Sequence, residues 1–585
     1  MTAEGKAAVI SSGAIAGSAA AGKAAVKPGQ LALQRIYQWE KARANDVYLT
    51  QPIGNGVRRD YTWAQAVGEA RRIAAYLKSR GYPPGSNIAL MSKNCAHWIM
   101  ADFAIWMAGH VSVPLYPTLA AETVRQILTH SEAKAIFIGK LDDWEMMKAG
   151  VPGNIDKISF PLSPASVLQN DGIPTWEHLL ETNAPLADSP VRGGDELATI
   201  IYTSGTTGMP KGVMHTFTGM AAAAEAGIKR FNGRAEDRGL SYLPLSHVAE
   251  RIGLELCSMA VGSHIFFAES LDTFAADLRH ARPTRFVSVP RLWVKFQQGV
   301  LSKMPQEKLD LFLKVPILSG ITRKKILTAL GLQDCELALG GAAPMPPQLL
   351  DWYKRIGLEI CEAYGMTENF GLSHANLAGK TKPGYVGFPY EHTEQRIDPA
   401  TGELQLRSPN TMTGYYKDPE RTREAFTDDG WLKTGDKAEF DGDGRVKITG
   451  RVKDLFKTSK GKYVAPAPIE DKLVMHPRIE ACCVAGANFG QPCALVMLNV
   501  DGQKEASNGR ESLEKSLAEH LGKVNAQLDP HEQMDFVAVV KDAWTVEAGF
   551  ITPSLKVKRN VVENAYGKFL DAWYAEGKPV VWQRL

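Results

Sequence analysis

Hydrophobic and polar positions alternate along the first third of the chain in a way that predicts helices and strands in turn. Residues 62–80 place apolar side chains three and four positions apart, as on one face of a helix. Short apolar runs follow, separated by further helical patterns. The expected helices span 62–80, 96–109 and 122–130, and the expected strands span 87–91, 111–116 and 135–138. Strands separated by helices form parallel sheets with both faces covered, so an α/β fold is predicted.

The pattern changes close to residue 450. Residues 429–450 are rich in turn residues, and 441–444 lie between two short strands, which predicts a β-hairpin. A charged segment follows, and then a compact βα pattern resumes. We expect a flexible Ala/Gly/Ser-rich tail over 1–28, a large N-terminal domain with a small β subdomain over 29–450, and a small mobile α+β domain over 451–585.

Composition and charge exclude several classes of protein. Lys and Arg total 67 and Asp and Glu total 64, and a net charge of +3 argues against nucleic-acid binding through bulk charge. Hydrophobic residues make up 44% and charged residues 22%, so wholesale disorder is excluded. The seven cysteines are scattered and form no C-x-x-C pair, which indicates neither a disulfide framework nor a zinc ribbon. No uncharged apolar run reaches about 18 residues. We expect a cytoplasmic protein with no transmembrane segment and at most a loose, peripheral association with membranes.

The segment 199–212 has the composition of a phosphate-binding loop. It reads Thr-Ile-Ile-Tyr-Thr-Ser-Gly-Thr-Thr-Gly-Met-Pro-Lys-Gly. A β-branched strand leads into hydroxyl and glycine residues, whose free N–H groups can form an anion-binding concavity. Lys211 adds a point charge suited to phosphate, and we expect an Ala-rich helix after it. The spacing G-x-x-x-x-G-K-[ST] of nucleoside triphosphatases is absent, because Lys211 precedes Gly212.

This string resembles one of the most specific motifs of the adenylate-forming (AMP-binding) superfamily, whose members activate carboxylic acids as acyl-adenylates. The resemblance covers nearly everything after residue 30, with several motifs in the correct order. It implies that the loop and Lys211 hold the β- and γ-phosphates of ATP. The loop residues concerned are Thr203, Ser204, Gly205, Thr206, Thr207 and Gly208.

Two further segments resemble the walls of the nucleotide site. The small-residue turn at Gly341, Ala342 and Ala343 is similar to the turn that borders the adenine and the acyl pocket. The string Tyr-Gly-Met-Thr-Glu resembles a motif in which an aromatic ring stacks on adenine, a hydroxyl bonds the α-phosphate and a carboxylate holds Mg²⁺. The resemblance gives these three roles, in that order, to Tyr364, Thr367 and Glu368.

The last motifs lie on both sides of the expected domain boundary. Asp436 resembles the carboxylate that accepts hydrogen bonds from the ribose hydroxyls, and Arg451 would assist it. Lys453 occupies the hinge position about which the small domain rotates. Lys556 matches a late catalytic lysine that contacts the carboxylate and the α-phosphate, with Lys558 as the alternative.

Three positions bear on the second substrate and on the acid. Gly461 resembles the glycine that leaves room in a tunnel for the pantetheine of coenzyme A. His247 lies in a segment similar to the long-chain acyl-CoA synthetase branch, where a histidine lies near the acyl carboxylate; a structural core histidine is the alternative. Leu555, where many members have glycine, also resembles that branch.

The resemblance therefore implies an AMP-forming acid–thiol ligase. ATP and coenzyme A are the expected co-substrates, Mg²⁺ is the expected cofactor, and a long-chain fatty acid is the expected acid. Three alternatives stay open: aryl or other bulky acids, loading of a carrier protein, and a non-catalytic nucleotide sensor. Retention of Glu368, Asp436 and Lys556 argues against the sensor.

Overall fold

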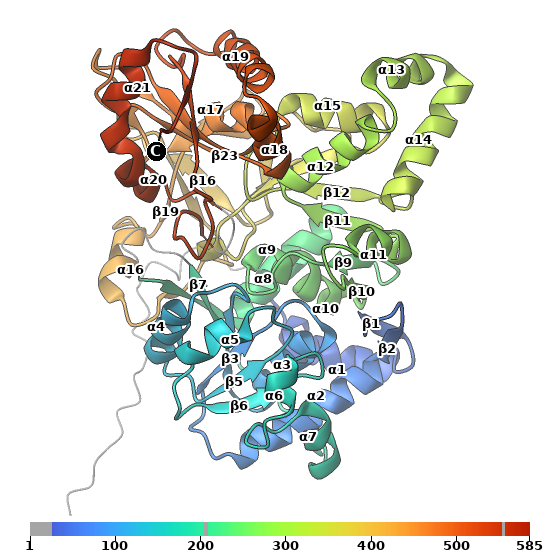
Figure 1. Ribbon diagram of the computed structural model, residues 1–585. Coiled ribbons are helices and arrows are strands. Elements are labelled where there is room, and N and C mark those ends of the chain that lie inside the picture. The colour runs from blue at the N-terminus through green and yellow to red at the C-terminus, as the bar shows by residue number, and fades with distance from the viewer. Residues whose placement is uncertain (1–25, 204–208, 553–555, 585) are drawn as a thin grey trace, which may run out of the picture.

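The computed structural model describes residues 26–203, 209–552 and 556–584. Most of the expected tail lies outside the described residues. The same holds for five residues of the phosphate-loop motif: Ser204, Gly205, Thr206, Thr207 and Gly208. The chain forms a large N-terminal region and a smaller C-terminal region, which is orange to red at the upper left of Figure 1. Both regions combine helices with parallel and antiparallel strands, so the predicted α/β class is confirmed.

A seven-stranded sheet forms the centre of the N-terminal region. Its order is β18 (Gly414–Tyr415), β8 (Lys211–Thr216), β7 (Leu197–Thr203), β4 (Val111–Leu115), β3 (Asn87–Met91), β5 (Ala135–Ile138) and β6 (Asp156–Ser159). The strands from β7 to β6 run parallel, whereas β8 is antiparallel to β7. The strands expected at 87–91, 111–116 and 135–138 are confirmed.

The chain after the phosphate-loop motif differs from the expectation. Lys211 does not lead straight into a helix, because β8 comes first and pairs Lys211 with Thr203. Only seven residues separate the two paired positions, which is too short for a crossover helix, so the strands form an antiparallel pair. The Ala-rich helix α8 (Phe217–Phe231) then begins after Thr216, whose side chain accepts a hydrogen bond from the Gly219 N–H.

Three more sheets complete the N-terminal region. The first is β2 (Arg58–Thr62), β1 (Val47–Pro52), β10 (His264–Phe267) and β9 (Arg238–Ser241). The second is β11 (Arg285–Ser288), β12 (Leu337–Gly340), β13 (Ile360–Tyr364), β14 (His374–Ala375) and β15 (Phe388–Pro389). The third is β16 (Glu394–Ile397), β17 (Glu403–Arg407), β19 (Leu432–Phe440) and β20 (Val446–Arg451). The hairpin predicted at 441–444 is confirmed as the turn between β19 and β20.

Helices cover these sheets and separate the parallel strands. Those of the N-terminal region, besides α8, are α1 (Ala32–Ala42), α2 (Trp63–Ser79), α3 (Ala96–Met107), α4 (Ala121–Ser131), α5 (Trp144–Met147), α6 (Ala165–Leu168), α7 (Trp176–Thr182), α9 (Val248–Glu250), α10 (Cys257–Val261), α11 (Phe274–Ala281), α12 (Pro290–Leu301), α13 (Gln306–Lys314), α14 (Pro316–Leu330), α15 (Pro347–Arg355) and α16 (Pro419–Ala425). Helices α2, α3 and α4 confirm the three predicted from periodicity.

The C-terminal region is built on its own sheets. A short pair, β21 (Phe456–Lys457) and β22 (Tyr463–Val464), precedes a sheet of β23 (Ile479–Ala485), β24 (Cys493–Leu498), β25 (Val537–Val540) and β26 (Val580–Trp582). Its helices are α17 (Pro466–Leu473), α18 (Val500–Asn508), α19 (Glu511–Asn525), α20 (Arg559–Tyr566) and α21 (Leu570–Glu576). An ion pair between Arg291 of α12 and Glu480 of β23 joins the two regions. Among the described residues, no helix combines the length and apolar character needed to cross a bilayer.

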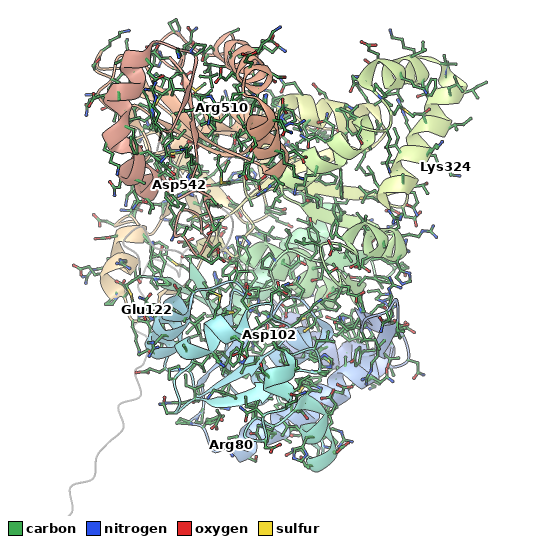
Figure 2. All side chains as sticks on the ribbon, viewed as in Figure 1. Arg80, Asp102, Glu122, Lys324, Arg510 and Asp542 are labelled. Carbon is green, nitrogen blue, oxygen red and sulfur yellow. The ribbon has the colours of Figure 1, made fainter. Side chains whose placement is uncertain are left out.

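A fully buried ion cluster joins α3 to the π-helical turn η4 (Arg251–Leu256). The guanidinium of Arg251 pairs with Asp102, labelled in Figure 2, and its Nε lies 3.3 Å from Glu255. All three side chains are inaccessible to solvent. Burial raises the pKa of Glu255 well above its usual range, although Arg251 opposes the shift. One cation is therefore shared by two buried carboxyl groups, of which Asp102 forms the closer pair.

Removing the cation from this cluster is expected to destabilise the fold strongly. Arg251→Met leaves Asp102 buried without its partner, and breaking such a pair costs about 3–5 kcal/mol of unfolding free energy. Without Arg251 the pKa of Asp102 rises further, so the loss should be smallest at acidic pH and grow as the pH increases. Urea unfolding at several pH values measures it. The control Arg59→Met removes an exposed pair and should cost less than about 1 kcal/mol; equal losses in the two variants would contradict the account.

Candidate active site

A carboxylate is fixed on the β19–β20 hairpin. Asp436 lies opposite Arg451 in the antiparallel register, and the Arg451 Nε is 2.9 Å from Asp436 Oδ1. The hydroxyl of Tyr364, at the end of β13, donates to Asp436 Oδ2 at 2.6 Å. Burial and the charge of Asp436 raise the pKa of Tyr364, so the phenol stays protonated. The hydroxyl of Tyr364 is thus engaged, and its aromatic ring is the part suited to stacking on a base.

A second carboxylate is positioned by a residue that the sequence motifs did not indicate. Glu368 Oε1 accepts a hydrogen bond from the hydroxyl of Tyr415 at 2.8 Å. The Lys211 Nζ lies 4.7 Å from the centroid of the same phenol ring, within range of a cation–π interaction. Tyr415 lies on β18, which pairs with β8, so the sheet brings the ring to the lysine. Tyr415 therefore links the phosphate-loop lysine to the carboxylate expected to hold Mg²⁺.

The neighbouring Thr367 is held by its backbone. His215 Nε2 donates to the Thr367 carbonyl at 2.7 Å, and burial lowers the pKa of His215 to about 4. The histidine is therefore neutral at physiological pH and fixes the position of the turn. Gly365 is required there, because a Cβ at this position would lie 2.1 Å from the carbonyl oxygen of Gly371.

Lys556 comes from the C-terminal region, and its charge interacts with this site. Loss of hydration and the positive charge of Arg451 lower the pKa of Lys556, while Asp436 and Glu368 oppose the shift. The residue as a whole keeps exposed surface, so solvent screens part of these effects. The amine is thus near enough to both carboxylates of the large region to interact with their charges. Its backbone N–H donates to the Thr552 hydroxyl at 3.0 Å.

His247 lies close to the same amine. The Nδ1 atom of His247 accepts a hydrogen bond from the Ala249 N–H at 3.1 Å, so a neutral ring carries its proton on Nε2. Burial and the charge of Lys556 lower the pKa of His247 to about 4, which keeps the ring neutral at physiological pH. The imidazole can therefore donate a hydrogen bond to a carboxylate but is not an ion-pair partner.

The small-residue turn follows β12 and lies beside β13. A Cβ added at Gly341 would lie 3.0 Å from the Ala363 carbonyl, and Ala342 has a positive φ of 66°. Ala342 and Ala343 are exposed, so the turn presents backbone and methyl groups rather than long side chains. This surface suits a flat ring or an apolar chain.

Other predicted residues lie apart from the cluster. Thr203 ends β7 opposite Lys211, whereas the five residues after it are outside the described chain. Lys453 is exposed in the turn after β20, two positions beyond Arg451. Gly461 is exposed between β21 and β22 with a φ of 76° and open space around it. Within the described residues, no interaction joins Lys453, Gly461 or the Lys558 side chain to the cluster, and their roles stay predictions.

Known families match both regions of the chain. Residues 37–416 match the AMP-binding enzyme family, and residues 453–578 match the AMP-binding enzyme C-terminal domain. The long-chain-fatty-acid–CoA ligase FadD15 of Mycobacterium bovis is 30% identical, over 90% of this chain and 94% of that protein. The peroxisomal long chain acyl-CoA synthetase 7 of Arabidopsis thaliana is 29% identical, over 91% of this chain and 85% of that protein.

Solved structures share the fold. The anthranilate CoA ligase AuaEII in complex with anthranoyl-AMP superposes with a TM-score of 0.73 at 21% identity, over 92% of this chain and 97% of that one. The adenylation domain of a carboxylate reductase from Mycobacterium chelonae gives a TM-score of 0.79 at 21% identity, over 94% and 92%. The predicted superfamily and its two-part architecture are confirmed, and the chain belongs to the family of AMP-binding enzymes.

Proposed function

We propose that this enzyme activates a long-chain fatty acid with ATP and transfers the acyl group to coenzyme A. Two relatives named above carry that activity in their names, and they align over nearly the whole chain. The observation that supports the proposal most is the position of Lys556. A cation from the C-terminal region lies near Glu368 and Asp436 of the large region, where a nucleotide and an acid would have to meet.

The first half-reaction requires positioning and charge neutralisation rather than a protein nucleophile. An oxygen of the fatty carboxylate attacks the α-phosphorus of ATP, the bond to the β-phosphate oxygen breaks, and pyrophosphate leaves with the electron pair. Lys211 would hold the leaving phosphates, and Lys556 the carboxylate and α-phosphate oxygens. His247, with its proton on Nε2, would donate to the carboxylate and orient it. Asp436 would accept hydrogen bonds from the ribose hydroxyls, with Arg451 keeping it in place.

Glu368 is suited to hold Mg²⁺ when the nucleotide is bound. Its Oε1 is oriented by Tyr415, while no hydrogen bond among the described residues is directed at Oε2. A free carboxylate oxygen is a hard ligand, and Mg²⁺ commonly binds through one or two carboxylates together with phosphate oxygens and water. The bound ion would neutralise charge on the phosphates. Glu368 and Tyr415 would fix the direction from which it is held.

The second half-reaction requires a different face of the C-terminal region against the acyl-adenylate. The thiol of coenzyme A attacks the acyl carbon, the bond to the AMP oxygen breaks, and AMP leaves as the thioester forms. The charge of Lys556 acts on Asp436 and Glu368, whereas Gly461 is exposed in the turn between β21 and β22. Rotation of the C-terminal region about Lys453 would exchange these faces, and the Arg291–Glu480 ion pair would then have to break.

A panel of acids tests the proposed substrate class. Each methylene that enters an apolar pocket contributes about 0.8 kcal/mol, so kcat/KM should rise about threefold to fourfold per methylene until the pocket is filled. We expect palmitate to exceed octanoate, and both to exceed benzoate, with equal amounts of AMP, pyrophosphate and acyl-CoA formed. A flat dependence on chain length with benzoate preferred would assign the enzyme to aryl acids. Transfer to a carrier-protein thiol in preference to coenzyme A would also contradict the proposal.

A further inference from the structure

Helices α13 and α14 form an arm that projects from the N-terminal region, at the upper right of Figure 1. The arm enters the hydrophobic core through buried Leu309 of α13 and Ile326 of α14, and Leu313, Leu327 and Leu330 pack against that core. None of residues 306–330 has a part in the proposed reaction. The arm is therefore free to serve another purpose.

The first turns of α14 have the reverse of the usual burial pattern. Ser319 and Thr322 are buried, whereas Ile317 is 78% exposed and Ile321 is 61% exposed. An ordinary surface helix places its apolar residues inward and its polar residues outward. Because Ile317 and Ile321 are four residues apart, they share one face of the helix. This face points away from the core and is not accounted for by folding.

Exposed apolar residues are concentrated at this end of the arm. We call the group the apolar tip, and its members are Leu311, Val315, Ile317, Leu318 and Ile321. These are five of the fifteen large apolar side chains that are exposed in the described part of the chain, and they fall within eleven consecutive residues. Single exposed apolar residues are ordinary, whereas several gathered at the end of one projecting arm favour an interaction surface.

Positive charge surrounds the apolar tip. Residues 303–325 contain six basic and two acidic residues. Lys324 and Lys325 follow Ile321 by three and four positions, which continues the exposed face one turn further along α14. One turn corresponds to about 5 Å along the axis. The Lys324 side chain points outward in Figure 2, away from the body of the protein. An apolar end with cations about one turn behind it matches the depth profile of a bilayer surface.

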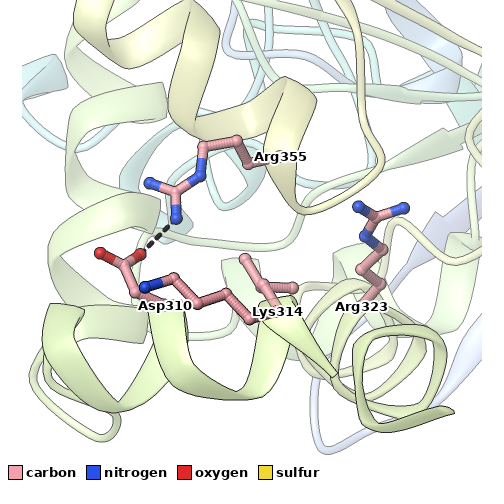
Figure 3. A pocket seen from close by; sticks show the side chains of 5 residues that line it. Asp310, Lys314, Arg323 and Arg355 are labelled. Atoms are coloured by element: carbon pink, nitrogen blue, oxygen red, sulfur yellow. Dashed lines mark hydrogen bonds and ion pairs between the residues drawn. The ribbon is translucent and has the colours of Figure 1, made fainter. Parts of the chain in front are cut away.

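A cavity between α13, α14 and α15 adds further cations. It has a volume of about 260 Å³ and is lined by Asp310, Leu313, Lys314, Arg323 and Arg355. Arg355 pairs with Asp310, as the dashed line in Figure 3 shows, whereas Arg323 lies apart from that pair. Within the described residues, neither Lys314 nor Arg323 forms an ion pair. The lining therefore carries three cations and one carboxylate, and Lys314 directly precedes Val315 of the apolar tip.

We propose that the apolar tip inserts into the surface of a bilayer that contains anionic lipids. Ile317 and Ile321 would enter the boundary between headgroups and acyl chains, while Lys324 and Lys325 remain at the level of the phosphates. Each lysine near such a surface contributes attraction that an uncharged surface does not provide. The proposal goes beyond the reaction itself, because binding to a bilayer requires neither ATP nor turnover.

Sedimentation of the full chain with lipid vesicles tests the proposal. The vesicles are phosphatidylcholine with a quarter of phosphatidylglycerol, compared with phosphatidylcholine alone. We expect the protein to bind the anionic vesicles, and this binding should weaken at high salt. Binding to the neutral vesicles should be weaker than binding to the anionic ones. Ile317→Ser/Ile321→Ser and, separately, Lys324→Glu/Lys325→Glu should each lower the affinity by about tenfold or more. Leu271→Ser removes a side chain that is 96% exposed on another part of the surface, and it should bind like the wild type.

The outcomes distinguish a failure of the proposed membrane-binding surface from a failure of the proposed reaction. Absence of vesicle binding by the wild type, or equal binding by the Ile317→Ser/Ile321→Ser variant, would overturn the proposal. A wild type that is dimeric in analytical ultracentrifugation, with a monomeric Ile317→Ser/Ile321→Ser variant, would also overturn the proposal. The apolar tip would then bind a second copy of the chain. Turnover of octanoate, which needs no membrane, should be equal in all four proteins and shows that they are folded. A protein that turns over octanoate without binding vesicles leaves the proposed function intact. A protein that binds vesicles but turns over no acid contradicts only the proposed function.

Discussion

Replacing Lys556 with alanine is expected to slow acyl-adenylate formation by about a hundredfold to a thousandfold, the usual loss when one preorganised charge donor is removed from a transition state. The amine lies near Glu368 and Asp436, where the α-phosphate would stand. ATP–pyrophosphate exchange in the presence of palmitate measures the effect. Transfer from synthetic palmitoyl-adenylate to coenzyme A should stay near the wild-type rate, because the C-terminal region presents a different face in that step.

The matched control for this variant is Lys558→Ala. Lys558 lies two positions further on, and its backbone N–H donates to the Phe550 carbonyl at 2.8 Å. Its loss should change pyrophosphate exchange by less than about tenfold, because no interaction within the described residues joins its side chain to the site. The lowered pKa of Lys556 adds a second signature. Adenylation should fall as the pH rises through that pKa, and this limb should be absent in Lys556→Ala. Equal defects in the two variants would contradict the assignment of the catalytic amine.

Glu368→Gln is expected to lower kcat by about a hundredfold and to raise the Mg²⁺ concentration needed for half-maximal rate. The amide keeps the shape and can still accept from Tyr415, but it removes the negative charge that would attract the ion. A Mg²⁺ titration at saturating ATP measures both effects.

Tyr415→Phe is the matched control for the metal ligand. It removes only the 2.8 Å hydrogen bond and keeps the aromatic ring beside Lys211, so a loss of about tenfold is expected. A Glu368→Gln variant whose Mg²⁺ dependence equals that of the wild type would show that another group holds the metal.

The sequence predicted elements best where periodicity is local. The amphipathic helix at 62–80 is defined by the spacing of its own apolar residues, and the strand at 87–91 by the shortness of its apolar run. Strand β8 was not expected, because its pairing with β7 depends on the length of a connection rather than on its own pattern. The reversed burial of α14 was equally hidden, since Ile317 and Ile321 show ordinary helical spacing and only the tertiary structure leaves them outside.

The residues of the candidate site also differ in whether local sequence identifies them. Asp436, Glu368 and Lys556 were identified through motifs in which residue order carries the chemistry. Tyr415 was not, because it contacts Glu368 across 47 positions and Lys211 through the pairing of β18 with β8. No spacing in the sequence indicates such a contact. The cluster of Arg251 with Asp102 spans 149 positions and was missed for the same reason.

The central claim is that the acid is activated by attack on the α-phosphate of ATP, and an isotope experiment tests it directly. Palmitate with a heavy oxygen isotope in its carboxylate is incubated with ATP, Mg²⁺, coenzyme A and the enzyme, and the products are analysed by mass spectrometry. We expect AMP to carry one heavy oxygen from the acid, because the carboxylate oxygen that attacks phosphorus stays on AMP when the thioester forms. Heavy oxygen in inorganic phosphate, with ADP in place of AMP, would show an acyl-phosphate route and contradict the account.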